Sequence, residues 1–438
     1  MKIVFISIGT RGDIQPSCVL GQELKKRGHQ VRIATEERVK YVVDKYDLEY
    51  FEIIGDSCAS LFDETEEGRK WMNSLSLEAL LKEKKNLDMN TPGRFESFYY
   101  ACEGMDLILP SALAYTEAFS INEKLGIPFI PLWLLPTMGT GAFPHMFLTD
   151  KNFYFKFLNK MTYKMIAKVC YKQEADRVAV WRKNFLQLGP LPKSIAQQMM
   201  EHTDQPVIMA FHEKILKSEK RPSEWSDNIC LPGFMFPSTE NTSPMPEKVA
   251  KFLEAGEPPV VFGLGSMPNP YGAKVVQIVK SVIKRLHLRC IFLKGWSVMK
   301  DMKDEEDIIF ADNIDHGLLF QKCSVIIHHG GVGSTAAALR SGVPSIVTWM
   351  YFDQPYWAKR TEEMGCGRQI KLNDMTEPML LDALKDIYRN SSYKVRALEV
   401  AIEINKANGS KDAADFIEQS LEKFDRVKNT TTVKINEI

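Results

Sequence analysis

The 438-residue sequence has no excess of charge of either sign, because 56 basic residues balance 56 acidic ones. This balance argues against general binding to nucleic acid, which requires a basic surface. The longest apolar stretch, residues 127–138, holds three prolines and is too short to cross a bilayer. We therefore expect no nucleic-acid partner and no membrane-spanning segment.

Two other features are missing. The first eight residues are largely apolar, but the run stops at Gly9, which is too short for the core of a secretory signal. The eight cysteines are scattered with no C-x-x-C pair, which favours free thiols over a disulfide framework or a zinc site. Together these absences predict a cytoplasmic protein.

The chain is long enough for two domains, since a single core stops growing at about 250–300 residues. Apolar β-rich runs alternate with helical stretches, which predicts an α/β protein with parallel sheets covered on both faces. A polar, proline-rich linker at 237–246 separates domains at 1–240 and 241–424. A helix over 412–424 is expected to close the second domain, and 425–438 to form a loose tail. The expected strands are 2–8, 30–35, 107–109, 129–132 and 207–210 in one sheet, and 259–263, 290–293, 308–310, 325–328 and 345–348 in another.

The most informative segment lies in the second half. A buried strand ends in His328 and His329, a glycine turn follows, and Ser334 begins an alanine-rich helix. Such an arrangement forms an anion site, because unpaired N–H groups and the positive end of the helix dipole converge there. A second strand brings Asp353 and Gln354 to the same edge of the sheet. Phosphate-binding and hydroxyl-binding groups at one edge suggest a sugar nucleotide.

A family resemblance supports this interpretation. Residues 328–357 read HHGGVGSTAAALRSGVPSIVTWMYFDQPYW. They resemble the donor signature of GT-B glycosyltransferases of the UDP-glucuronosyl/UDP-glucosyltransferase superfamily (glycosyltransferase family 1), and in particular its sterol 3-β-glucosyltransferase branch. The resemblance implies two Rossmann-like parallel-sheet domains that face each other across a cleft, with the acceptor bound by the first and the UDP-sugar donor by the second. Five further segments match that branch in order, at 9–16, 136–145, 225–234, 261–267 and 294–297.

Asp13 is the candidate catalytic base. Attack by an alcohol requires a group that accepts the hydroxyl proton, and Asp13 follows the first strand at the carboxyl edge of its sheet. The resemblance favours this role, whereas local sequence alone favours a helix cap, because Asp often precedes a helix. Thr10 and Arg11 of the same turn are expected at the donor, although Arg11 has an alternative role in holding the turn.

The donor contacts follow from the resemblance. Alternation along a strand sends His328 and His329 to opposite sides, so one reaches phosphate while the other packs; which one is open. Asp353 and Gln354 would bind the sugar hydroxyls. Phe352 stands where the branch usually has glycine, and Asp315 stands where it has proline. The remaining implied donor contacts are Ser266, Asn313, Ile314, His316, Val332, Gly333 and Ser334.

No metal or other cofactor is expected. Metal-dependent transferases usually hold a divalent cation with a D-x-D pair, which this sequence lacks. Backbone N–H groups, a hydroxyl and a histidine would then stabilise the charge on the leaving diphosphate.

The acceptor is expected to contact an apolar region before residue 171, which suits a flat lipid. The implied contacts are Trp133, Met138, Phe143 and His145. Residues 151–172 carry six lysines and no acid, which predicts a basic amphipathic helix. Its apolar side would contain Leu158, Met161, Met165, Ile166 and Val169. The lysine face is either a solvated face of a domain helix or a peripheral membrane contact.

The sequence therefore predicts an inverting, metal-independent transferase that moves glucose from UDP-glucose to the hydroxyl of a sterol or similar lipid. One alternative is a transferase of the same fold that uses another nucleotide sugar and a glycolipid, a polyketide or another apolar small molecule. A second alternative is an inactive module that binds lipid or nucleotide.

Overall fold

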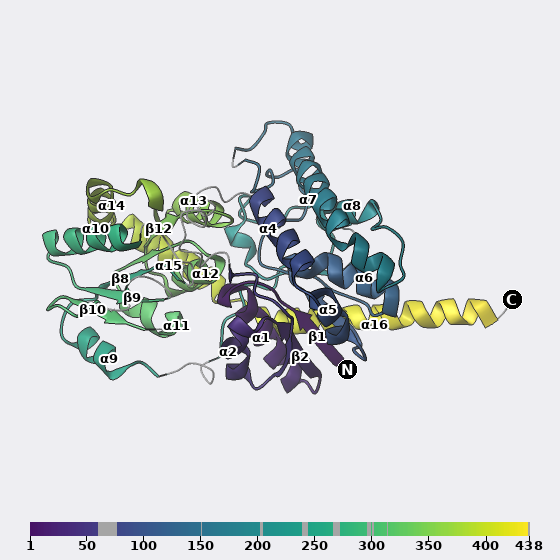
Figure 1. The fold of residues 1–438 in the computed structure, drawn as a ribbon. Helices are drawn as coiled ribbons and strands as arrows, with labels where there is room; N and C mark the ends of the chain where they lie inside the picture. The colour runs from purple at the N-terminus through teal and green to yellow at the C-terminus, as the bar shows by residue number, and fades with distance from the viewer. Residues whose placement is uncertain are drawn as a thin grey trace.

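The computed structural model describes residues 1–59, 77–149, 151–201, 205–238, 244–265, 272–295, 299, 302–312 and 314–436. Two α/β domains lie side by side, with the chain ends on the side of the first (Figure 1). Within the described residues, no helix combines the length and the apolar character needed to cross a membrane.

The first domain contains two small parallel sheets where the sequence predicted one. The first sheet has the order β3-β2-β1-β4, and the second has the order β5-β6-β7. A single parallel bridge between Ile108 and Phe129 connects them, with Ile130 N donating to Ile108 O at 2.9 Å. The strands are β1 Lys2–Ile6, β2 Gln30–Thr35, β3 Glu49–Glu52, β4 Leu107–Pro110, β5 Leu132–Trp133, β6 Val207–Met209 and β7 Ile229–Cys230.

Helices cover both sheets of the first domain. The first helix begins at Arg11, directly after Thr10, because the Thr10 turn provides its cap. The described α-helices are α1 Arg11–Lys26, α2 Lys40–Val43, α4 Leu77–Asn90, α5 Arg94–Cys102, α6 Tyr115–Leu125, α7 Lys156–Asn184 and α8 Ser194–Glu201.

The second domain is built on one six-stranded parallel sheet with the order β10-β9-β8-β11-β12-β13. Its strands are β8 Val260–Gly263, β9 Cys290–Leu293, β10 Ile308–Ala311, β11 Val325–His328, β12 Ser345–Trp349 and β13 Gly367–Lys371. Five of these match predicted strands; the polar edge strand β13 was not predicted. The helices are α9 Glu247–Glu254, α10 Gly272–Arg285, α11 His316–Leu319, α12 Val332–Ser341, α13 Gln354–Glu363, α14 Glu377–Arg389 and α15 Ser392–Ile404.

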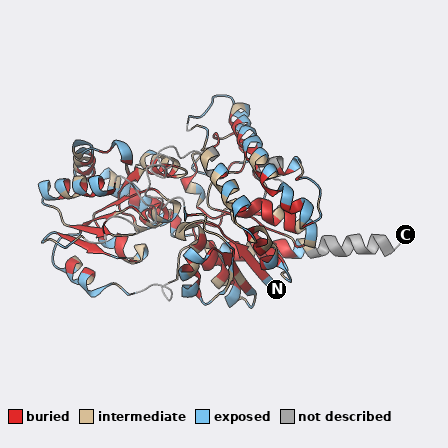
Figure 2. Cartoon of the chain, viewed as in Figure 1, coloured by how far each residue is buried: buried red, intermediate tan, exposed pale blue. Residues whose placement is uncertain are grey.

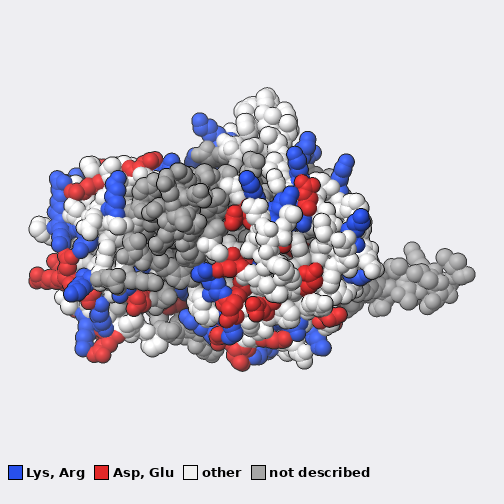
Figure 3. Space-filling model, viewed as in Figure 1, with Lys and Arg blue, Asp and Glu red and all other residues white. Residues whose placement is uncertain are grey.

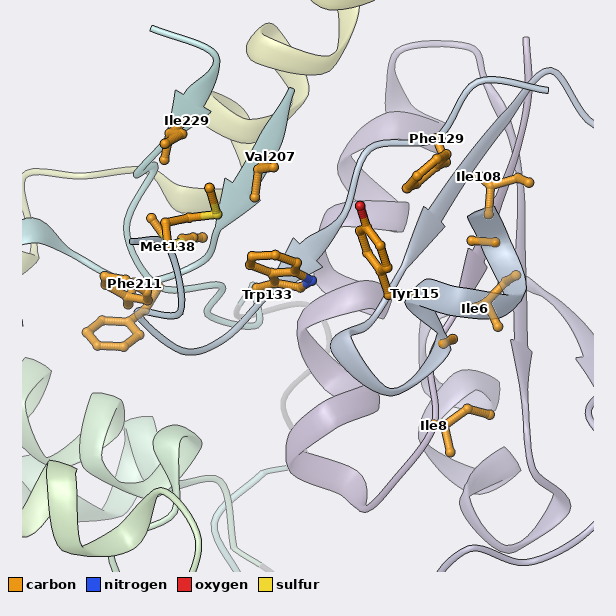
Figure 4. Packing of buried hydrophobic residues seen from close by; sticks show 14 of the residues in the cluster. Ile6, Ile8, Ile108, Tyr115, Phe129, Trp133, Met138, Val207, Phe211 and Ile229 are labelled. Carbon is orange, nitrogen blue, oxygen red and sulfur yellow. The ribbon is translucent and has the colours of Figure 1, made fainter. Parts of the chain in front are cut away.

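Buried side chains are concentrated on the strands and on the helix faces that cover them (Figure 2). In the first domain, one hydrophobic cluster joins the two sheets. Tyr115 lies between them, with its ring 5.5 Å from Phe129 and 6.0 Å from Trp133 (Figure 4). This packing holds the start of the second sheet, and therefore Trp133, in a fixed position relative to β1 and β4.

The last helix, α16 (Gly409–Asn436), differs from its prediction in two ways. It returns to the first domain and packs on α1, rather than closing the second domain (Figure 1). The Arg27 guanidinium pairs with Asp415 at 2.6 Å and with Glu418 at 2.9 Å. The helix also continues to Asn436, where the sequence predicted a loose tail. The apolar stripe that drives this packing consists of Ala413, Ala414, Ile417 and Leu421.

Candidate active site

A cavity of ≈1420 Å³ lies between the two domains and is lined by both. The turn after β1 contributes one wall, and the segments that follow β11 and β12 contribute the opposite wall. These segments leave the carboxyl ends of parallel strands, where open α/β sheets bind their ligands. Most of the predicted site residues that the structure describes lie on these walls.

Asp13 lies on the cavity wall at the third position of α1. Its Oδ2 accepts hydrogen bonds from Thr10 N at 2.8 Å and from Thr10 Oγ1 at 3.1 Å. Thr10 is thus the N-cap, and Asp13 is its capping-box partner rather than the cap itself. Both proposed uses of Asp13 are compatible, because the capping bonds occupy one carboxylate oxygen and the residue still faces the cavity.

The surroundings of Asp13 favour its protonated form more than water does. Burial raises its pKa above 3.8, although the hydrogen bonds from Thr10 oppose the shift. Gly9 makes the close approach possible: its φ is +129°, and a Cβ there would lie 2.4 Å from Asp13 Oδ2. The nearby Arg11 lines the same wall and donates from Nε to Gln15 at 3.2 Å.

The anion site predicted after β11 has the expected parts. Helix α12 begins at Val332, two residues before the predicted Ser334, so the first-turn N–H groups belong to Val332, Gly333 and Ser334. All three residues line the cavity. A Cβ on Gly333 would meet no atom within 4 Å, so this position opens onto free space. The Thr335 hydroxyl in the same turn is buried without a partner among the described atoms.

His328 and His329 both line the cavity, but their surroundings differ. His328 Nδ1 accepts from Gly330 N at 3.2 Å, so the neutral ring carries its proton on Nε2, which has no partner among the described atoms. His329 packs between glycines: a Cβ on Gly265 or Gly331 would lie 2.4 or 2.5 Å from its ring. Burial lowers the pKa of His328 to about 3 and that of His329 to about 4, so both rings are neutral at physiological pH.

The structure describes only some of the other implied donor contacts. Ser266 and Asn313, together with Trp296, lie outside the described residues. Ile314 is buried, and both Ile314 and His316 line the cavity. The His316 ring stacks on Phe320 with centroids 4.4 Å apart. The pKa of His316 is lowered to about 3, mainly by burial and then by the positive charge of Arg11.

Asp315, which replaces a proline of the resembling branch, serves as the cap of α11. Its Oδ1 accepts from Gly317 N at 2.8 Å and from Leu318 N at 3.3 Å. The Asp315 side chain therefore caps the start of α11 in place of a proline, and Asp315 itself lines the cavity.

Asp353 and Gln354 follow β12 and line the cavity. Asp353 Oδ2 accepts from Trp357 Nε1 at 2.7 Å, and Gln354 Oε1 accepts from Met350 N at 2.8 Å. The amide oxygen of Gln354 is thus engaged by the loop, so Gln354 offers a ligand its NH₂ donors. Burial raises the pKa of Asp353 to about 6, and the negative charge of Asp13 adds to this shift. A carboxylate from each domain therefore faces the same space.

Phe352 has a left-handed backbone with φ of +56°. A bulky residue at positive φ is a true outlier, whereas glycine adopts this conformation freely. This explains why the resembling branch has glycine here. Phe352 also lines the cavity, so the larger residue adds strain and reduces space at one position.

The predicted acceptor residues divide into two groups. Trp133 and His145 line the cavity. The Nε1 of Trp133 and the Nε2 of His145 are buried and have no hydrogen-bond partner among the described atoms. Met138 and Phe143 are instead buried in the core, 1% and 2% exposed, and Phe143 packs edge-on against Trp225. A role for these two residues at the acceptor stays a prediction, because an apolar run alone does not reveal which side chains turn inward.

Helix α4 forms a part of the wall that the sequence did not predict. Leu81, Lys84 and Leu87 line the cavity. Their spacing in the sequence indicates that they share one face of a helix, but it does not indicate that this face borders the cavity. A buried charge cluster holds this helix in place. Asp88 of α4 bridges Arg94 of α5 and Arg177 of α7, all at most 3% exposed. Among the described residues, no three His, Cys, Asp or Glu side chains are grouped to hold a metal ion.

Comparisons with known proteins agree with this architecture. Residues 3–144 match the glycosyltransferase family 28 N-terminal domain, and residues 300–417 match the C-terminal domain of erythromycin biosynthesis protein CIII-like proteins. A sterol 3-β-glucosyltransferase of Pichia angusta is 27% identical over 463 residues, which cover 100% of this chain and 35% of the relative. The chain thus spans about a third of the length of the curated relatives it matches.

Solved structures show the same fold. The glycotransferase of kitacinnamycin has a TM-score of 0.68 at 17% identity, covering 95% of this chain and 98% of its own. The glycosyltransferase SsfS6 of Streptomyces sp. SF2575, complexed with thymidine diphosphate, has a TM-score of 0.63 at 18% identity and covers 96% and 99%. Two Rossmann-like domains around a shared cleft, together with these matches, identify the GT-B fold of nucleotide-sugar glycosyltransferases. Within that class, the chain is distantly related to sterol 3-β-glucosyltransferases over its full length.

Proposed function

We propose that this protein transfers glucose from UDP-glucose to the hydroxyl group of a sterol or similar apolar lipid, with inversion at the anomeric carbon and without a metal ion. The observation that carries the proposal is the composite cavity. A partly buried carboxylate of the first domain, Asp13, lines the same cavity as a helix N-terminus and a second carboxylate, Asp353, of the other domain.

In the proposed reaction, the acceptor oxygen attacks the anomeric carbon as the bond from that carbon to the diphosphate oxygen breaks. Asp13 accepts the hydroxyl proton, and the nucleoside diphosphate leaves on the opposite face of the sugar. The raised pKa of Asp13 supports this role, because a base whose pKa lies nearer the working pH accepts the proton more readily. The Thr10 hydrogen bonds hold the carboxylate in place.

The leaving diphosphate would be stabilised by the first turn of α12 and by His328. The N–H groups of Val332, Gly333 and Ser334 point from the helix N-terminus, and neutral His328 donates from Nε2. The unpartnered Thr335 hydroxyl is a further donor of the same turn. These groups, together with the lack of a D-x-D pair in the sequence, support a mechanism without a metal.

The sugar would be oriented by Asp353, which accepts hydrogen bonds, and by the Gln354 NH₂ group, which donates them. The acceptor would lie against the wall that contains Trp133 and His145, with Leu134, Met146 and Phe147 supplying apolar contact. The names of the relatives favour a sterol. The strained Phe352 and the TDP complex of SsfS6 favour, as a second candidate, a different nucleotide sugar and another apolar acceptor.

The test is release of nucleoside diphosphate from UDP-glucose, UDP-galactose, UDP-xylose and a TDP-deoxysugar, each with sterol and non-sterol lipid acceptors, with products identified by mass spectrometry. We expect UDP-glucose with a sterol to give the highest rate, unchanged by excess EDTA. A different best donor would refute the glucosyl assignment. Loss of activity in EDTA, restored by Mg²⁺, would refute the metal-free mechanism, and no turnover with any pair would leave a binding module.

Asp13→Asn tests the base directly. The amide oxygen can still accept from Thr10, so the cap of α1 is retained while the proton acceptor is lost. We expect turnover to fall by roughly 10²–10⁴-fold, with UDP binding measured by calorimetry unchanged. Asp382→Asn, an exposed acid on α14, is the matched control. Near-normal turnover in Asp13→Asn would exclude Asp13 as the base.

A further inference from the structure

The segment before α7 exposes an unusual group of aromatic side chains. Tyr154 is 92% exposed, Phe155 58% and Phe157 59%, and Phe153 is also exposed. The Tyr154 and Phe155 rings lie 5.1 Å apart, and the Phe155 and Phe157 rings lie 6.0 Å apart. We call Phe153, Tyr154, Phe155 and Phe157 the aromatic tip. Contiguous exposed aromatics of this kind mark an interaction surface rather than ordinary solvent-facing residues.

The exposed face of α7 continues this surface. The sequence predicted that the lysines and the apolar residues would lie on opposite sides of the helix. Instead, Met161, Met165 and Val169 are exposed next to Lys160, Lys164 and Lys168, whereas Ile166 turns inward. The reason is that Asn159, Thr162, Tyr163 and Cys170 occupy the buried side together with Ile166. The outer face of α7 is therefore both apolar and basic.

The charge of this region has one sign. Residues 151–172 contain six lysines and no Asp or Glu, although the chain as a whole is neutral. Lys160 makes an ion pair with Glu224 at 3.5 Å, and Lys156 and Lys168 are exposed. Figure 3 shows uncharged atoms projecting at the top of the first domain, with Lys and Arg side chains on either side. An aromatic projection with lysines around it is complementary to a partner that has an apolar interior and an anionic outer layer.

The same helix forms the wall of the cavity. Ile166, Cys170 and Glu174 line the cavity from the inner side of α7, and Met146 and Phe147 line it from the segment before the tip. The exposed face of α7 and the cavity thus lie on opposite sides of the same helix.

We propose that the aromatic tip and the outer face of α7 dock the protein on an anionic lipid membrane. The aromatic rings enter the interfacial region, where amphipathic and apolar rings are favoured, and the lysines contact anionic headgroups. Docking brings the acceptor side of the cavity to the bilayer, which is the source of the lipid acceptor. The choice of acceptor rests on the proposed function, whereas the docking itself does not.

Co-sedimentation with lipid vesicles tests the docking without any catalytic readout. We expect binding to phosphatidylcholine vesicles that contain phosphatidylserine, little binding to phosphatidylcholine alone, and weaker binding as salt is raised. The triple variant Tyr154→Ser, Phe155→Ser, Phe157→Ser and the double variant Lys156→Glu, Lys168→Glu should each weaken binding by at least about tenfold.

Matched controls separate this surface from general effects. Val180→Ser removes an exposed apolar residue from the far part of α7, and Lys274→Glu with Lys303→Glu makes the same charge change in the second domain. Both controls should bind vesicles as the unaltered protein does. All of these residues are exposed, and equal unfolding midpoints would show that every variant is folded.

Three results would overturn the proposal. They are no binding of the unaltered protein to anionic vesicles, binding by the triple and double variants that equals that of the unaltered protein, or a dimer that the triple variant dissociates. The last result, measured by light scattering, would make the tip an interface between two copies. Vesicle binding that depends on the tip, without transfer to any lipid, would support docking while refuting the proposed acceptor class.

Discussion

The raised pKa of Asp353 predicts that this residue destabilises the free protein at neutral pH. Asp353 is largely shielded from solvent in the cavity, and burial followed by the charge of Asp13 raises its pKa from 3.8 to about 6. A pKa difference of this size corresponds to about 3 kcal/mol against folding when the group is ionised. Asp353→Asn removes the charge and keeps an amide oxygen to accept from Trp357 Nε1, so it should stabilise the folded state by up to about 3 kcal/mol.

The pH dependence of this effect has a definite sign. Below pH 3.8 the carboxyl is protonated in both the folded and the unfolded chain, so it contributes no difference. As the pH rises towards 6, the unfolded chain ionises freely while the folded chain resists, and the unaltered protein loses stability relative to Asp353→Asn. The gain of the variant should therefore be absent in acid, grow between pH 3.8 and about 6, and stay constant above that.

Urea unfolding followed by tryptophan fluorescence at a series of pH values measures the difference, with Asp382→Asn as the exposed control. The pKa of Asp353, followed by NMR titration, should also fall in Asp13→Asn, because the neighbouring charge is removed. A variant no more stable than the unaltered protein at pH 8, or a gain that is the same at every pH, would refute the reasoning. The expected cost of the variant is weaker use of the sugar donor, because the same carboxylate is proposed to bind it.

Three further predictions concern the base, the strained loop and the buried charges. Because burial raises the pKa of Asp13, the rate of transfer should fall in acid as Asp13 is protonated, with a midpoint above pH 3.8. A fall in the pH–rate profile only at or below that value would contradict the assignment. In urea unfolding, Phe352→Gly should be more stable than Phe352→Ala by roughly 1 kcal/mol, because both variants lose the ring but only glycine adopts the φ of +56° without strain. Equal stability of the two variants would mean that the left-handed conformation is not strained. Asp88→Asn should cost about 1.5–3 kcal/mol, because it weakens the charged hydrogen bonds to Arg94 and Arg177 while Glu36, Glu117 and Glu174 still pair with the two arginines. Asp44→Asn, which breaks the exposed pair with Lys40, should cost less than about 1 kcal/mol. Similar losses in the two variants would show that the buried cluster is not a structural support.

Much of the fold was predictable because parallel strands have a strong local pattern. Buried β-rich runs such as 290–293 and 325–328 appear in the structure at the predicted bounds. The short strands β3 and β7 and the edge strand β13 carry too few apolar residues to be recognised alone. The path of α16 was not predictable, because an apolar stripe states that a helix packs but not on which domain.

The site was predictable to the extent that its residues follow strands. Asp13 and Asp353 come soon after the carboxyl end of a parallel strand, and His328 is the last residue of one, so their place on the cavity wall follows from topology. Met138 and Phe143 come from a long irregular segment, where no periodicity tells the core from the wall, and the structure places them in the core. Helix α4 lines the cavity through contacts with α5 and α7, which depend on tertiary packing around Asp88.

Phe352 shows what a departure from a family pattern means when its physical cause is known. The sequence alone indicated a change in pocket shape; the structure adds that the position has a backbone conformation for which glycine is suited. With phenylalanine at this position the backbone is strained. The neighbouring residues, Tyr351 and Asp353, are not glycines and do not relieve the strain. Strain of this kind persists where surrounding packing enforces it, and here the strained residue lines the cavity. Phe352 therefore bears directly on the proposed choice of donor sugar, which the panel of nucleotide sugars tests.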